Sequence, residues 1–260
     1  MEIILGLVTG LLIGLTGTGG GVLLTPLLLL LTSFPTTVII GTSLLVGAVT
    51  KAAGAIVHRR LGHVHGRLAL LLIAGSVPGA LSGVLLIQKI QSTFLASQLD
   101  SFLRWVLALT LLGVAVFLPF VSRKRNRDAQ RGRGLAEFSE LSYIRPARFV
   151  ALGAGVGFMV ALTSVGSGSL MMAFLLLMVP LPIARLVGTD IFFGLAATVV
   201  AGSLHLWMGH FDGGLFAKLA IGAVPGVIVG SRMTRWLPEI SFRWLFSLLY
   251  FSLAARLLVG

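Results

Sequence analysis

Long apolar runs dominate the pattern of hydrophobic and polar positions along the chain. Four of them hold one ionisable side chain or none, namely Ile3–Leu31, Val38–Val57, Leu68–Ile87 and Leu215–Val229. A helix of about 20 apolar residues crosses a hydrocarbon core of roughly 30 Å. The pattern therefore predicts an all-α integral membrane protein with several spans.

Two segments, Ile3–Leu31 and Val150–Met178, are longer than one span requires. Each has 29 residues, about 43 Å as a continuous helix. Each is interrupted near its middle, by Gly17–Gly21 and by Ser164–Gly168. The pieces on either side have about 14 residues, roughly 20 Å, and are too short to span alone. Each segment is therefore either one tilted broken helix or a re-entrant hairpin of two half-helices.

Small and polar residues of the second half repeat those of the first at one offset, 147 positions. The matches include Gly188-Thr189 on Gly41-Thr42, His205 on His58, Gly209-His210 on Gly62-His63, and Val224-Pro225-Gly226 on Val77-Pro78-Gly79. Composition alone produces matches of apolar residues, but not of Gly, Pro, His and Thr. The offset indicates a duplicated unit, an organisation common in transporters.

Arginine placement favours one topology for the two copies. If both broken segments are hairpins, each copy crosses three times and the second copy is inverted. Placing the Arg-rich stretch 123–148 inside then also places inside Arg59, Arg60, Arg67, Arg185, Arg232, Arg235 and Arg243. Full crossing would make the copies parallel and move the last four arginines outside. The positive-inside rule favours the inverted arrangement, with both termini outside.

The predicted organisation is a first transmembrane repeat over 1–121, a basic cytoplasmic linker over 122–148 and a second repeat over 149–260. Each repeat consists of a broken, re-entrant glycine-rich hairpin and three transmembrane helices. The linker is interpreted as a solvated connector, with a regulatory or RNA-binding role as the alternative. Short loops fit a multi-pass protein of a bacterial inner membrane.

Composition supports this class and removes others. Hydrophobic residues make up 57% and charged residues 11%, against about 25% charged in soluble domains. The net charge of +12 is explained by topology and by anionic lipid headgroups rather than by nucleic acid. The absence of cysteine excludes disulfides and thiolate metal sites.

The glycine-rich breaks are the strongest candidates for a substrate site. Backbone groups at a helix end inside a membrane need partners from neighbours, water or a substrate. A half-helix that begins after Gly20-Gly21 offers N–H groups and partial positive charge to an anion. Helix packing through small residues is the alternative. The substrate-binding candidates at the breaks are Thr16, Thr18, Gly19, Gly20, Gly21, Thr163, Ser164, Gly166, Ser167 and Gly168.

Gly41-Thr42-Ser43 and its copy Gly188-Thr189-Asp190 extend this candidate set, with Thr42, Ser43, Thr189 and Lys51 as further ligands. Charged residues inside spans are expensive and indicate function. Lys51 could attract an anion or extend its ammonium to the cytoplasmic surface. Asp190 could carry a proton, pair with Lys51, or accept a buried hydrogen bond from Thr189, Ser43 or a broken-helix N-terminus.

The histidines form a third group: His58, His63 and His65, repeated as His205, His210 and Asp212. Turn structure is the favoured interpretation, and pathway lining or pH sensing by His58 and His205 is the alternative. No thiolate or Glu cluster supports a metal site. No metal or cofactor is expected, and the spans lack a catalytic motif such as His-Glu-x-x-His, so an enzyme is not expected.

These motifs resemble the sulfite exporter family, TauE/SafE. The resemblance rests on the break Thr16–Gly21 with Pro26, on Pro35 and Gly41-Thr42-Ser43, and on their second copies, and it covers nearly the whole chain. It implies a membrane carrier, often an exporter, for sulfite, organosulfonates or related sulfur-containing anions. The second copy departs from the first at Ser164, Ser167, Ala173 and Asp190, which replace Gly17, Gly20, Pro26 and Ser43. These departures make the second copy the more polar half.

The expected mechanism is alternating access around an anion held between the two breaks, with Asp190 as the candidate for proton linkage. A passive anion channel, or a permease for a small anion without sulfur, would use the same features and stays an alternative. Saturable counterflow separates a carrier from a channel. A homodimer is the default expectation for assembly.

Overall fold

The computed structural model describes residues 1–16, 21–93, 95–130, 145–233 and 239–259. These residues form helices and connecting turns, and no β-strand occurs among them. Six helices in this part of the chain are long and apolar enough to cross a membrane: α3 (Thr36–Arg60), α4 (Gly66–Thr93), α5 (Ala96–Gln130), α6 (Pro146–Thr163), α8 (Ile183–Trp207) and α9 (Gly213–Met233). The prediction of an all-α integral membrane protein is confirmed.

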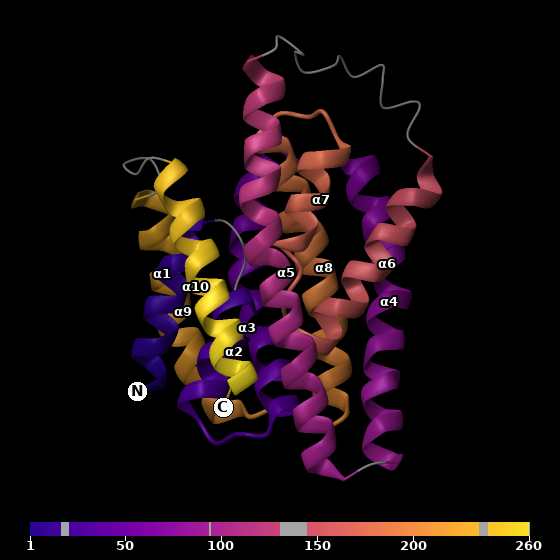
Figure 1. The fold of residues 1–260 in the computed structure, drawn as a ribbon, viewed down its shortest axis with the longest axis vertical. Helices are drawn as coiled ribbons and strands as arrows, with labels where there is room; N and C mark the ends of the chain where they lie inside the picture. Colours follow the sequence, from indigo (N-terminus) through magenta and orange to yellow (C-terminus); the bar gives the residue numbers. More distant parts are fainter. Residues whose placement is uncertain (17–20, 94, 131–144, 234–238, 260) are drawn as a thin grey trace.

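The two long segments each consist of two helices. The first gives α1 (Glu2–Thr16) and α2 (Gly21–Leu31), and the second gives α6 and α7 (Leu170–Met178). Figure 1 shows the N-terminus and the loop after α2 at one end of the bundle, and the start of α6 and the loop after α7 at the other. Each segment thus begins and ends at the same end of the bundle, as a hairpin does. The prediction that every piece is too short to span alone is wrong for α6, because this helix begins at Pro146 and its 18 residues are enough to cross a membrane.

The 147-residue offset reappears in the boundaries of the helices. It separates the starts of α3 and α8, the starts of α4 and α9, and the ends of α1 and α6. The last helix, α10 (Glu239–Val259), packs against α5. Helix α5 continues to Gln130, so the start of the predicted linker at residue 122 lies within a helix.

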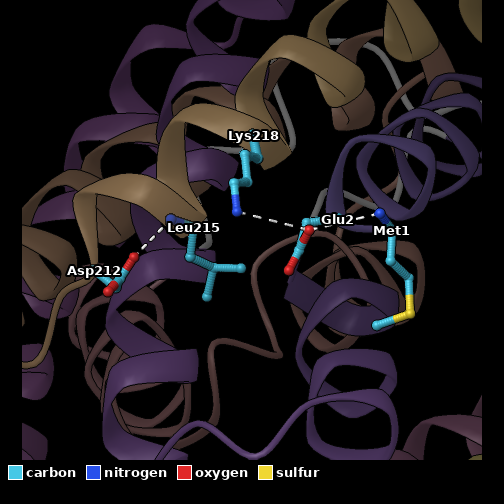
Figure 2. Close-up of polar contacts among 5 residues, drawn as sticks. All are labelled: Met1, Glu2, Asp212, Leu215 and Lys218. Atoms are coloured by element: carbon cyan, nitrogen blue, oxygen red, sulfur yellow. Dashed lines mark hydrogen bonds and ion pairs between the residues drawn. The ribbon is translucent and has the colours of Figure 1, made fainter.

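Helices of one half pack chiefly on helices of the other: α1 on α9, α6 on α4, and α3 on α8. Figure 2 shows the first of these pairs at its end, where the Glu2 carboxylate lies 3.9 Å from the Lys218 ammonium. Such exposed ion pairs contribute little. The two halves are interlocked, so neither forms a separate compact unit.

Glycines explain the close approach of these pairs. A methyl group added to Gly153 would overlap the carbonyl oxygen of Leu72, and one added to Gly6 would overlap that of Leu219. Small residues four apart let helices in lipid approach to backbone contact. The glycines that make such contacts are Gly6 and Gly10 with Gly222 and Gly226, and Gly153 and Gly157 with Gly75 and Gly79. The packing interpretation of glycine is therefore correct for these positions.

Gly41 of α3 and Gly188 of α8 each contact the backbone of a loop in the opposite half. A Cβ on Gly41 would overlap the carbonyl oxygen of His210, and one on Gly188 would overlap that of His63. Both contacts join residues far apart in sequence. The two Gly-Thr motifs thus hold the halves together.

The threonines of these motifs form hydrogen bonds with the same loops. Thr42 Oγ1 accepts a hydrogen bond of 3.2 Å from the backbone N–H of Asp212, and Thr189 Oγ1 accepts one of 3.0 Å from that of His65. Their hydroxyls are engaged in joining the halves. We therefore leave Thr42 and Thr189 out of the substrate site considered below.

The histidine turns end α3 and α8 with the same geometry. The backbone N–H of His63 donates to the carbonyl of His58 at 3.0 Å, around Gly62 with a φ of 67°. The corresponding turn after α8 has Gly209 at a φ of 76°. A left-handed glycine with this hydrogen bond is a Schellman motif, which accounts for the repeated Gly-His pairs.

His65 and Asp212 cap the next helices. His65 Nδ1 accepts a hydrogen bond of 3.2 Å from Leu68 N–H at the start of α4. Asp212 Oδ1 accepts one of 2.6 Å from Leu215 N–H at the start of α9 (Figure 2). A side-chain acceptor at this position satisfies a free N–H of the first turn. His65 must be neutral at Nδ1 to act in this way.

Acidification is expected to destabilise the protein through His65 and His210, which lie outside the spans. Burial lowers the pKa of His210, and burial with the nearby charges of Arg185 and Arg67 lowers that of His65. A histidine with a depressed folded pKa supports the fold above its unfolded pKa of about 6.5, and this support is lost as pH falls below it. Thermal unfolding in detergent at pH 7.5 and at pH 5 measures the effect.

The second repeat supplies the matched variant for this prediction, His65→Asp, because Asp212 holds the equivalent cap. This variant should keep the cap and show a smaller loss of melting temperature on acidification. An equal loss of melting temperature in wild type and His65→Asp would show that protonation of His65 does not cause the destabilisation.

Candidate functional site

The break between α6 and α7 is defined by its backbone. Gly166 and Gly168 have φ values of 131° and 115°, and Ser164 has a φ of 61°. The first two values are available essentially to glycine alone. Every residue from Thr163 to Ser169 is buried. The prediction of an interrupted, hydroxyl-rich segment in the second half is thus confirmed.

Lys51 reaches this break from α3. Its side chain is only 6% exposed, and Nζ donates hydrogen bonds of 2.8 Å each to the carbonyl oxygen and to Oγ of Ser167. The interpretation that Lys51 extends to the cytoplasmic surface is therefore wrong. The ammonium fits because position 194 is glycine, where a Cβ would overlap Nζ.

Asp190 faces the same break from α8, one turn before Gly194. It is 3% exposed, and its carboxyl group interacts with the backbone N–H of Gly168. Oδ1 has no hydrogen-bond partner among the described residues, and no ion pair within 4.0 Å joins it to Lys51 there. Of the predicted alternatives, the structure favours a position of the carboxyl group at the N-terminal side of the broken helix α7 over an ion pair with Lys51.

Several other buried hydroxyl groups lack a partner in the described part of the chain. They belong to Thr25, Thr36, Ser43, Ser164 and Ser169, each at most 2% exposed. An unsatisfied buried polar group costs about 1–3 kcal/mol. Such groups in native proteins indicate a bound ion, ligand or water. Ser164 and Ser169 lie in the same break as Ser167, so their unpartnered hydroxyls and the Lys51 ammonium are suited to hold a small polar anion.

The two halves differ in charge at this level. At the offset of 147, Lys51 corresponds to Thr198 and Asp190 corresponds to Ser43. The Thr198 methyl lies 3.8 Å from the Cβ position of Gly47, in the place where Lys51 meets Gly194. Lys51 and Asp190 therefore both lie at the second break. The offset of 147 could have revealed Gly47, Gly194 and Thr198 from sequence.

His205 holds the end of α6 at the break. Its Nε2 lies 2.9 Å from the Ala161 carbonyl and its Nδ1 lies 3.3 Å from His210 Nδ1, while His210 Nε2 lies 2.9 Å from Gln91 Nε2. A carbonyl only accepts and an amide NH₂ only donates, so this arrangement of contacts is satisfied with both rings neutral. Gln91 was missed because its repeat counterpart is Pro238.

The remaining candidates are placed as follows. Thr163 Oγ1 donates to Met159 O at 2.6 Å and accepts from Val165 N–H at 3.1 Å, so its hydroxyl is engaged locally. His58 lies 5.5 Å from His63 between ring centroids, in the last turn of α3. Gly21 begins α2. The Thr16 side chain and residues Thr18, Gly19 and Gly20 lie outside the described residues. The described residues contain no group that could hold a metal ion.

The sequence model of the family described as "Sulfite exporter TauE/SafE" matches residues 2–257. The chain belongs to the TauE/SafE family. It is 32% identical over 234 residues, 89% of each chain, to a protein of Bacillus subtilis (strain 168) described as the probable membrane transporter YjnA. Two further B. subtilis proteins described in the same words, YdhB and YunE, are each 26% identical over 89% of this chain.

No solved structure matches the TauE/SafE chain. The family and these relatives make it a multi-pass membrane transporter of the inner membrane and not an enzyme. The relatives' descriptions name no substrate.

Proposed function

We propose that this TauE/SafE transporter carries sulfite or a related sulfur-containing anion, and that the anion binds at the second break beside Lys51. The observation that carries this proposal is the buried Lys51 ammonium on Ser167. A buried positive charge attracts anions strongly where water is excluded. Unpartnered hydroxyls of Ser43, Ser164 and Ser169 would supply the further donors that sulfite oxygens need.

We further propose that the two halves form inverted repeats, that they alternate access to this site, and that export is the direction. The hairpin arrangement in Figure 1 and the helix pairs that join the halves support the first point. In transporters with inverted repeats, one bundle rocks against the other around a site at broken helices. Homodimer formation stays a prediction.

Purified protein in liposomes tests the proposal. Vesicles loaded with unlabelled sulfite should accumulate external labelled sulfite by counterflow, and sulfate, thiosulfate and a small sulfonate should compete according to their affinity. Saturable counterflow is the expected result. Uptake that never saturates and shows no counterflow would indicate a channel. Saturable counterflow of a small anion without sulfur, with none of sulfite, would correct the substrate class.

Asp190 is proposed to carry a proton in the direction opposite to the anion, so that an inward proton gradient drives export. Asp190→Asn should retain counterflow and lose the acceleration that an outwardly directed proton gradient gives to wild-type uptake. The amide keeps the shape of the carboxyl group and cannot titrate. Asp100→Asn is the control, because Asp100 Oδ1 accepts from Thr36 N–H at the start of α3 and does not touch the break. An unchanged gradient response in Asp190→Asn would exclude this role.

A further inference from the structure

A groove lies where the turn between α3 and α4 meets the first turns of α4 and the side of α8. Its volume is about 340 Å³, within the range of ligand pockets, roughly 300–1,000 Å³. The lining residues that carry the inference are Arg59, Val64, Gly66, Ala69, Ile73 and Phe192. The groove lies apart from the Lys51 site, and the transport mechanism does not use it.

The second repeat fills the equivalent place. Val64 and Ala69 correspond at the 147-residue offset to Phe211 and Phe216. The rings of these two phenylalanines pack together with centroids 5.6 Å apart. The same local fold is thus filled by two aromatic rings in one half, and the small side chains Val64 and Ala69 leave it hollow in the other.

The glycines at the starts of α4 and α9 show the same difference. Nothing lies within 4 Å of the Cβ position of Gly66. At its counterpart Gly213, the Phe211 ring is 3.7 Å from that position. The groove is therefore a local feature of the first half, not a general property of the repeated turn.

The groove also carries a charge that its counterpart lacks. Arg59 lines it, and the residue at the offset of 147 is Leu206. The ion pairs in the described part of the chain both involve Glu2, so no carboxylate there neutralises Arg59. A ligand that matches the charge of Arg59 is an anion.

The charged part of the groove lies at the end of the bundle, and its apolar part lies deeper along α4 and α8. Arg59 lies in the last turn of α3, at the end of the bundle where α6 begins (Figure 1). Ile73 and Phe192 lie about 10 Å and 14 Å into α4 and α8 from that end, at 1.5 Å per residue. Nearby Leu70 is 68% exposed, so the groove opens to the lipid side. An occupant with an anionic head and an apolar tail matches this order.

We propose that the groove binds an anionic phospholipid, with its phosphate on Arg59 and one acyl chain along Ala69, Ile73 and Phe192. Basic pockets between transmembrane helices on the positively charged side of a membrane protein bind anionic lipid headgroups. Arginine suits phosphate because its planar donors pair with two oxygens. The lipid would fill the space that Phe211 and Phe216 fill in the second half.

Native mass spectrometry of the purified full chain tests this proposal with phosphatidylglycerol and phosphatidylcholine of identical acyl chains. Phosphatidylglycerol should bind more tightly to wild type. Arg59→Gln should weaken its binding about tenfold, the effect of losing one charge-assisted contact, and should weaken phosphatidylcholine less, because the choline cation offsets the charge of its phosphate. Arg60→Gln is the control, because Arg60 neighbours Arg59 but does not line the groove.

The double variant Val64→Phe/Ala69→Phe copies the filled groove of the second half and should abolish the preference for phosphatidylglycerol. Its size-exclusion profile and melting temperature check that it folds. If the double variant does not fold, the Arg59→Gln result tests the lipid proposal on its own. Equal binding of the two lipids to wild type would overturn the proposal. So would phosphatidylglycerol binding that Arg59→Gln leaves unchanged, or equally tight binding of inorganic phosphate.

Discussion

Lys51→Met is expected to lower the rate of sulfite transport about 10- to 100-fold, since losing one hydrogen bond between a charged group and the anion costs about 1.5–3 kcal/mol. Methionine matches the length of lysine without its charge. It would leave Ser167 without the ammonium that now contacts its carbonyl oxygen and Oγ. It would also remove the positive charge that attracts the anion. Initial rates of labelled sulfite uptake into liposomes measure the effect.

Two variants make the Lys51 result specific. Lys218→Met removes an exposed lysine of α9 that pairs with Glu2, and it should transport at the wild-type rate. Lys51→Arg keeps the charge, but the larger guanidinium must fit against Gly194 and should give an intermediate rate. A folded Lys51→Met protein that transports sulfite normally would place the substrate site elsewhere.

The largest effect on stability is expected at the glycine contacts between the halves. Gly153→Ala should lower the free energy of unfolding by about 1–3 kcal/mol, the usual cost of an added methyl group in a packed core. Its Cβ would overlap the carbonyl oxygen of Leu72, so α4 and α6 would have to separate. Thermal unfolding of the purified protein in detergent measures the loss.

Gly155→Ala on the same helix is the matched control. Nothing lies within 4 Å of its Cβ position, and alanine favours a helix over glycine by roughly 0.5–1 kcal/mol. Gly155→Ala should therefore be neutral or slightly stabilising. Equal melting temperatures for Gly153→Ala and Gly155→Ala would contradict the packing account of the repeated glycines.

Much of the fold could be predicted because each level of the pattern depends on local chemistry. Apolar runs give the spans, and the glycine-rich interruptions give the breaks. The offset of 147 gives the correspondence between α3 and α8. Glycine itself was ambiguous, since Gly153 packs against a neighbouring backbone whereas Gly166 has a φ of 131°. Sequence does not separate these two roles, because both require the absence of a side chain.

The site could be predicted only in part. Lys51 and Asp190 were identifiable because charges inside spans are rare. That both converge on the second break depends on how α3 and α8 cross, which no local pattern encodes. The contacts of Thr42 and Thr189 could not be predicted for the same reason: their partners, the backbone N–H groups of Asp212 and His65, lie in loops of the opposite half.

Equilibrium binding of labelled sulfite to the purified protein tests the central claim most directly, with wild type, Ser167→Val and Thr16→Val measured side by side. Saturable binding to wild type that is lost in Ser167→Val is the predicted result, because valine removes the Oγ contact beside Lys51. The Thr16 variant reports on the first break in the same experiment. Sulfite binding of undiminished affinity in a folded Ser167→Val protein would contradict an anion site at the second break.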